Sequence, residues 1–187
     1  MSNQLAVLFP GIGYHIDKPL LYYSAKLARA RGYDLLAVQY PALPTGLRGH
    51  AEKIEQAVQT ALSAAEEQLT AIDWTAYDRV FFLSKSIGTA IAARYAVQHN
   101  IHPRQVYYTP IEQALPYLDP TGIAFHGTAD PWARTELITE GCRRLGVPLH
   151  LTENADHSME TGDVLRDITI LHTILEQTDR WMRQRCI

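Results

Sequence analysis

Residues 80–89 read VFFLSKSIGT, and this stretch decides how the rest of the chain is interpreted. Its first half is a short apolar run that is typical of a buried strand, and it breaks into Ser-Lys-Ser-Ile-Gly. The residues that follow, 89–99, have the amphipathic pattern of a helix. The stretch therefore predicts a strand, a sharp turn and a helix.

The turn has the pattern of a nucleophile elbow, in which a serine stands at the tip of a strand-to-helix turn above the carboxyl edge of a parallel sheet. Ser86 would be the nucleophile. Small residues are needed two positions to either side, because strand and helix pass close together there. Gly88 meets this need, whereas position 84 is Ser where the usual pattern has Gly. The alternative is an ordinary loop whose serine caps the helix.

The chain has 187 residues, and no linker, repeat or low-complexity tract divides it, so we expect a single domain over residues 1–187. A formal net charge of -3 gives no basic field that would attract nucleic acid or an acidic membrane. No apolar run approaches the length of a membrane span. We therefore expect neither nucleic acid nor a membrane as a partner.

The N-terminus, MSNQLAVLFPG, enters a predicted strand almost at once and lacks the basic region of a signal peptide. The two cysteines, Cys142 and Cys186, fall in separate predicted helices and lack the spacing of a zinc site or a redox pair. Free thiols are expected. Together these features predict a cytoplasmic protein.

Six short apolar runs are predicted strands, at residues 5–9, 35–39, 79–84, 105–108, 121–125 and 148–151. Five segments with helical periodicity are predicted helices, at residues 20–31, 50–69, 86–99, 135–145 and 164–185. Because strands alternate with helices, right-handed βαβ units are expected. The result is an α/β fold, a three-layer α/β/α sandwich with a mostly parallel six-stranded sheet, whose site lies at the carboxyl ends of the strands.

A serine hydroxyl is a poor nucleophile at neutral pH, so an elbow serine needs a histidine to take its proton and a carboxylate to orient that histidine. After the fifth predicted strand the chain reads AFHGTADPW, which places Asp130 in a loop at the carboxyl edge. After the sixth it reads LTENADHSME, which places His157 likewise. Ser86, Asp130 and His157 are therefore the expected catalytic residues.

The elbow, HGTADP and NADHS together resemble the motifs of the α/β-hydrolase family, and they occur in that family's chain order. The resemblance covers nearly the whole chain, whose six strands would correspond to the family core without its two leading antiparallel strands. It is closest to small cap-free members such as dienelactone hydrolases and short carboxylesterases. Capped relatives carry an insertion where this chain has only the short, proline-rich segment 110–120, so the resemblance implies a minimal fold without a cap domain and an open site.

The same resemblance implies an oxyanion hole. The family's His-Gly-X-Gly appears here as Pro10-Gly11-Ile12-Gly13, without the leading His. The carried-over donors are the backbone N–H groups of Ile12 and of Ile87, the residue after the nucleophile. Each such donor contributes on the order of 3 kcal/mol of transition-state stabilisation.

Other residues compete for these roles. Ser84 is a rival nucleophile, and the rival carboxylates are Asp119, Asp156 and Asp163. His126 is interpreted as a structural hydrogen-bonding residue rather than the base.

A substrate pocket is expected to involve Tyr14, His15, Lys85, Trp132 and Met159. Lys85 could attract an anionic substrate or be solvated. For His15 the alternative is an exposed loop, and for Trp132 and Met159 it is ordinary core packing.

The predicted function is that of a serine hydrolase that cleaves a small ester or thioester through an acyl-enzyme, with a small-molecule acyl substrate as its partner and no metal or organic cofactor. A non-catalytic ligand-binding or receptor protein on the same scaffold, a serine peptidase and an acyltransferase remain alternatives. A nucleotide-binding doubly wound domain is a further alternative, although PGIGYH lacks the full dinucleotide pattern and the chain has no Walker lysine motif. No oligomeric state is predicted.

Overall fold

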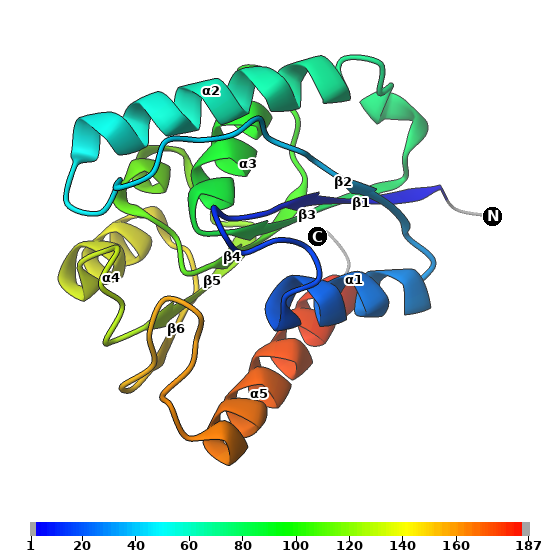
Figure 1. Cartoon of the computed structure of the whole chain (residues 1–187). Helices are drawn as coiled ribbons and strands as arrows, with labels where there is room; N and C mark the ends of the chain where they lie inside the picture. The colour runs from blue at the N-terminus through cyan, green and yellow to red at the C-terminus, as the bar shows by residue number, and fades with distance from the viewer. Residues whose placement is uncertain (1–2, 185–187) are drawn as a thin grey trace.

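The structure is a computed structural model that describes residues 3–184. Its centre is a six-stranded sheet in the order β2-β1-β3-β4-β5-β6, and every neighbouring pair is parallel (Figure 1). The strands are β1 (Gln4–Phe9), β2 (Asp34–Ala37), β3 (Arg79–Lys85), β4 (Arg104–Tyr108), β5 (Gly122–Gly127) and β6 (Leu149–Thr152). The predicted α/β class is confirmed, with an entirely parallel sheet.

Helices cover both faces of the sheet (Figure 1). The helices are α1 (Pro19–Ala30), α2 (Ala51–Leu69), α3 (Ile87–Gln98), α4 (Thr135–Leu145) and α5 (Val164–Arg183). Buried residues of α2, α3 and α4 share one apolar core, and those of α1 and α5 share the other. The predicted helix 164–185 ends at Arg183; position 185 and Cys186 lie outside the described residues.

The strand sequences follow from this layering. In β1 the side chains of Leu5, Val7 and Phe9 enter the core beneath α2 and α3, while Ala6 and Leu8 enter the core beneath α1 and α5. A parallel strand that is buried on both faces reads as a continuous apolar run, because neither face meets water. At the sheet edge, β2 ends two residues earlier than predicted.

The connection from β4 to β5 is short. Between Tyr108 and Gly122 it forms one 3₁₀ helix, Glu112–Tyr117, which contains Pro116. A second 3₁₀ helix, Trp74–Ala76, precedes β3 and was not predicted. The β4–β5 connection carries no cap, as the sequence predicts, and the carboxyl edge of the sheet stays uncovered there.

None of the helices within residues 3–184 is long and apolar enough to cross a membrane.

Leu62→Ala should lower the free energy of unfolding by about 2–4 kcal/mol, because it removes a buried side chain and leaves a cavity between α2 and the sheet. Leu62 is 1% exposed. Leu165 of α5 is 78% exposed, so Leu165→Ala should change the free energy by no more than about 0.5 kcal/mol. Urea denaturation of both variants measures the difference, and equal losses would contradict the described core.

Candidate active site

Ser86 lies between β3 and α3 with an unusual backbone conformation, φ 56° and ψ −124°. Positive φ is costly for a residue with a side chain, so neighbouring contacts must hold it. The Ser86 amide donates to the Tyr108 carbonyl at 2.9 Å, and the Ser86 carbonyl accepts from the amide and hydroxyl of Thr89 at 2.9 and 2.6 Å. These bonds fix the sharp turn that the sequence predicts.

The start of α3 passes very close to the end of β1. A Cβ atom placed on Gly88 would lie 2.1 Å from the carbonyl oxygen of Phe9, which leaves room for glycine alone. Position 84 differs, because the Ser84 side chain is buried in the sheet and its hydroxyl donates to the Val106 carbonyl at 2.8 Å. A serine is therefore accommodated where the usual motif has glycine.

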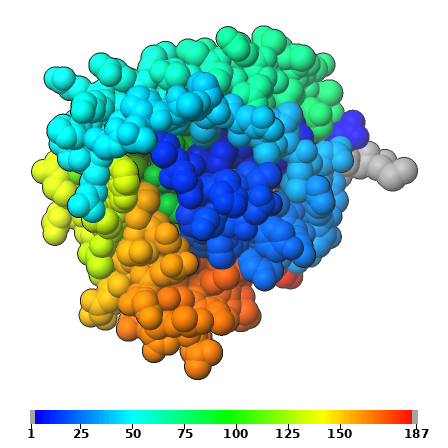
Figure 2. Space-filling model, in the orientation of Figure 1, coloured from blue at the N-terminus to red at the C-terminus, as the bar shows by residue number. Residues whose placement is uncertain are grey.

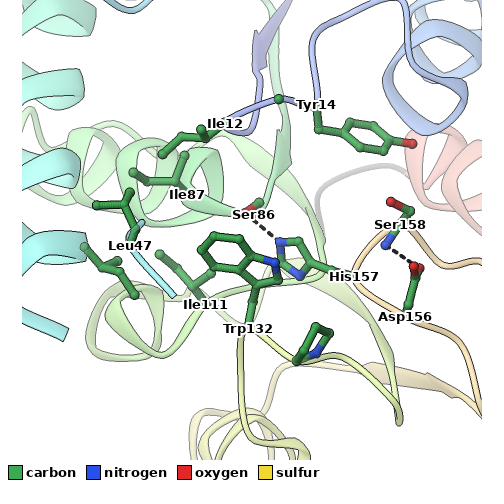
Figure 3. Close-up of a pocket in the computed structure, with 13 residues that line it drawn as sticks. Ile12, Tyr14, Leu47, Ser86, Ile87, Ile111, Trp132, Asp156, His157 and Ser158 are labelled. Carbon is green, nitrogen blue, oxygen red and sulfur yellow. Dashed lines mark hydrogen bonds between the residues drawn. The ribbon is translucent and has the colours of Figure 1, made fainter. Parts of the chain in front are cut away.

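Ser86, His157 and Asp130 form a hydrogen-bonded chain. His157 Nε2 lies 2.7 Å from Ser86 Oγ, and His157 Nδ1 lies 2.7 Å from Asp130 Oδ2 (Figure 3 shows the Ser86 contact). An ionised carboxylate can only accept, so Nδ1 carries the imidazole proton and Nε2 accepts from the serine hydroxyl. The other Asp130 oxygen accepts from the Trp132 amide at 2.8 Å.

Backbone contacts bring the loops of Asp130 and His157 together. The Ala129 amide donates to the Ala155 carbonyl at 2.9 Å, and a Cβ atom on Gly127 would lie 2.2 Å from that same oxygen. The two loops thus touch a few residues from the side chains that they carry. This contact explains why the motifs after β5 and β6 converge.

Burial lowers the pKa of the His157 imidazole below its ordinary 6.5, and the charge of Lys85 lowers it further, whereas Asp130 raises it. Burial alone would raise the pKa of Asp130, but the hydrogen bond and charge of His157, the Trp132 amide and the charge of His126 together hold that pKa below its ordinary range. At neutral pH the pair is an imidazole and a carboxylate. This is the state in which His157 can accept a proton.

A cavity of about 270 Å³ opens beside the Ser86 hydroxyl. One side of it is apolar and the other is polar (Figure 3). The apolar lining consists of Ile12, Leu47, Ile54, Ile87, Ile111 and Trp132. Figure 2 shows the surface hollowed where the loop after β1 meets the segments before α2 and after β6.

No protein-family model matches the chain, and no curated protein sequence matches it. Solved structures resemble it over nearly its whole length. A serine hydrolase without a lid from Xanthomonas campestris is 14% identical, with 100% of this chain and 86% of that chain covered and a TM-score of 0.64. The chain has the α/β-hydrolase fold.

Two further structures agree with this assignment. An α/β serine hydrolase homologue from Coxiella burnetii is 14% identical, with 95% of this chain and 85% of that chain covered and a TM-score of 0.63. A sugar hydrolase from Lactococcus lactis is 18% identical, with 98% and 90% covered and a TM-score of 0.65. The predicted resemblance to α/β hydrolases, including cap-free ones, is confirmed.

Within this α/β-hydrolase fold, the three rival carboxylates accept hydrogen bonds from residues close to them in the chain. Asp119 accepts from Thr121, Asp163 caps the start of α5, and one oxygen of Asp156 accepts from the amides of Ser158 and Glu160. His126 is fully buried, and its Nε2 lies 3.1 Å from the Thr135 hydroxyl. Its Nδ1 lies 3.7 Å from Asp130 Oδ2, the oxygen that contacts His157, and no hydrogen bond links His126 to Ser86 among the described residues.

The loop after β1 lies against the elbow. A tight turn is closed by mutual backbone bonds between Gly11 and Tyr14, and a Cβ atom on Gly11 would lie 3.1 Å from Ser86 Cβ. Ile12 is in this turn and lines the cavity. Ile87 is the first residue of α3, so its amide has no acceptor within the helix.

The expected pocket residues divide into two groups. Tyr14 and Trp132 line the cavity, and the Trp132 ring centroid lies 5.7 Å from that of His157. His15 is exposed and lies 3.4 Å from Asp17, outside the cavity lining. Met159 is buried in the core beneath α1 and α5. His15 thus lies in an exposed loop and Met159 packs in the core, which are the alternatives stated for these two residues.

Lys85 is neither solvated nor part of the cavity lining. It is completely buried, because β3 continues through residue 85 and the strand alternation turns this side chain toward the core beneath α1 and α5. Sequence reasoning also missed Leu47, Ile54, Ile111 and Pro131 as lining residues. They meet only through the tertiary fold, so the sequence carries no local signal for them.

Within residues 3–184, no group of three or more His, Cys, Asp or Glu side chains could hold a metal ion.

Gly88→Ala should cost about 3 kcal/mol or more of folding free energy, because its methyl group would collide with rigid backbone. Gly13→Ala is the matched comparison: its methyl group would meet no atom within 4 Å, but its φ of 70° is strained, so about 1 kcal/mol is expected. Urea denaturation of both variants measures the loss of folding free energy caused by collision at position 88 and by backbone strain at position 13. Similar losses in the two variants would contradict the close crossing.

Proposed function

We propose that this protein is a serine hydrolase that cleaves small esters or thioesters through an acyl-enzyme on Ser86. One observation carries the proposal: a serine hydroxyl at a strained elbow, 2.7 Å from an imidazole that is itself 2.7 Å from a buried carboxylate, beside an open cavity. The low-identity structural likeness supplies the scaffold and supports a hydrolase. The roles of the residues are argued from their chemistry.

In the proposed mechanism Ser86 Oγ attacks the substrate carbonyl carbon while His157 Nε2 takes the hydroxyl proton. The tetrahedral oxyanion is bound by the backbone N–H groups of Ile12 and Ile87. When it collapses, the bond to the leaving alcohol or thiol breaks, and His157 gives that group its proton. The acyl group is then esterified to Ser86. Water, activated by His157, releases the acid and restores the serine.

Asp130 orients the base and stabilises the imidazolium that forms in each step. Its carboxylate is already fixed by the Trp132 amide, so little reorganisation is needed as charge develops on His157. The lowered pKa of Asp130 keeps it ionised during this change. The hydrogen-bonded chain is thus preorganised for proton transfer.

The cavity supports a small substrate with an apolar acyl group. Its volume of about 270 Å³ is slightly below the usual range for small-molecule sites, roughly 300–1,000 Å³. The apolar side would exclude water from the acyl chain, whereas Asp156 and Ser158 lie on the polar side (Figure 3). The short β4–β5 connection leaves the entrance open to water, which the second half of the reaction requires.

A fluorophosphonate probe should label wild-type protein at Ser86, because the probe phosphorylates an activated serine. Labelling should be abolished in Ser86→Ala and fall about 10³-fold or more in rate in His157→Ala and Asp130→Asn. Mass spectrometry of the labelled peptide identifies the site, and time courses give the rates.

Two matched variants serve as controls. Ser84→Ala removes the rival hydroxyl, and Asp163→Asn changes a carboxylate that caps α5; both should retain labelling at Ser86. A folded wild type that stays unlabelled would contradict the hydrolase and favour a ligand-binding protein on this scaffold.

Ile54→Ala should shift acyl-chain preference toward chains longer by about two methylene groups, because truncation deepens the apolar side of the cavity. Ile54 also borders a neighbouring cavity of about 500 Å³, so the truncation opens the wall between the two. The measurement is kcat/KM over p-nitrophenyl esters from acetate to octanoate. Ile168→Ala, at a position 57% exposed on α5, should leave the preference unchanged. An unchanged preference in Ile54→Ala would contradict this acyl site.

A further inference from the structure

Lys85 occupies an unusual position for a lysine. It is the last residue of β3, directly before Ser86, and its side chain is 0% exposed. Among the described residues its Nζ has no hydrogen-bond partner. The ammonium group instead lies over the ring of Tyr14, 4.7 Å from the ring centroid, in a cation–π contact.

This placement is unfavourable for an ammonium group. Burial disfavours the charged form and lowers the pKa of Lys85 from 10.5 to about 7. The neighbouring positions on the same side of β3, Phe81 and Leu83, are apolar and belong to the core beneath α1 and α5. An apolar side chain of similar length would fill position 85 without this cost.

The surroundings of Lys85 connect it to the hydrogen-bonded chain. Lys85 directly precedes Ser86, and the Tyr14 ring that its ammonium group covers lines the same cavity as Ser86 and His157. In keeping with this placement, Asp130 and Asp156 raise the pKa of Lys85, and the charge of Lys85 lowers the pKa of His157. Tyr108 is its register neighbour on β4. The titratable groups that face Lys85 and His157 come from the loop after β1, from β4, from β5 and from the loops after β5 and β6. They are Tyr14, with Glu160 acting on it, Tyr108, His126, Asp130, Asp156 and His157 itself.

We propose that Lys85 is a positioning residue that acts through His157: its buried ammonium group keeps the imidazole unprotonated in mildly acidic solution, so that the imidazole can still take the Ser86 proton. This inference rests on the proposed hydrolase function. Lys85 itself touches neither the substrate cavity nor the reacting atoms.

The Lys85 ammonium group is charged in the same pH range in which His157 would otherwise become protonated. Below about pH 7 the Lys85 ammonium is formed, and this is also the range in which an imidazole would take up a proton. Two positive charges in a poorly solvated region repel each other, so protonation of His157 is displaced to lower pH. Asp130 acts in the opposite direction, and Lys85 offsets it.

Lys85→Met tests the role, because methionine fills the site without a charge. The pH at which His157 is half-protonated should rise by about one unit, since the repulsion is lost. NMR titration of ¹³C-histidine-labelled protein, assigned with His157→Ala, measures this pH directly. The acidic limb of kcat/KM for p-nitrophenyl acetate should move by the same amount.

Two variants control for charge removal. Lys26→Met removes an exposed lysine that lies at the same distance, 4.7 Å, from the Tyr22 ring, and it should leave the titration unchanged. Lys85→Arg retains the charge and should keep the His157 midpoint near that of wild type. A midpoint that is unchanged in Lys85→Met would overturn the proposal.

Folding supplies an independent check. Between pH 7 and 10.5 unfolded Lys85 binds a proton that the folded form has lost, so this group makes wild-type stability rise with pH through that window. Lys85→Met should fold, because methionine fills the site without the cost of a buried amine. Its free energy of unfolding, measured in urea, should exceed that of wild type by more at pH 7 than at pH 10. An advantage independent of pH would contradict the buried amine.

The outcomes separate the two proposals. Absence of probe labelling in wild type would overturn the hydrolase, whereas the His157 titration reports on Lys85 whether or not the protein turns over an ester.

Discussion

The close crossing of β1 and α3 is the constraint on which the site depends. With no side chain at Gly88, the helix can begin against the Phe9 carbonyl, and this places Ser86 at the tip of the turn with a positive φ. The same contact sets the loop after β1 beside the elbow, where Ile12 lines the cavity. A strained serine is stable here because both ends of its turn are held by backbone hydrogen bonds, to which the Thr89 hydroxyl adds one more.

At the carboxyl edge of this parallel sheet, several ionisable side chains lie close together. Asp130 and His157 lie in the loops that follow β5 and β6, and Lys85 is the last residue of β3, so a carboxylate, an imidazole and an ammonium group all lie buried or partly buried near this edge. Asp130 raises the pKa of His157 and Lys85 lowers it, because interactions between charges are little screened away from water. The protonation state of the imidazole is therefore set by burial together with Asp130, Lys85 and His126, and not by its carboxylate partner alone.

Much of this arrangement could be predicted from the sequence, and the reason is local. Ser86, Asp130 and His157 each follow a strand within a short motif, and parallel strands bring all three to one edge of the sheet. The structure places them in hydrogen-bond contact; their catalytic role stays a prediction. Part of the cavity wall could not be predicted, since Leu47, for example, lies in a loop with no pattern. The burial of Lys85 was missed because the strand was ended at Ser84, one residue too early.

Backbone control of the site also explains how little sequence the fold requires. The structures that share it are 14–18% identical to this chain. Gly88 is required by a carbonyl oxygen of β1, and Gly127 is required by the Ala155 carbonyl of the loop that carries His157. These contacts involve main-chain atoms that any sequence supplies, so most side chains can change while the site keeps its shape. Position 85 lies outside this constraint, and its residue is free to set the pH range over which the base is neutral.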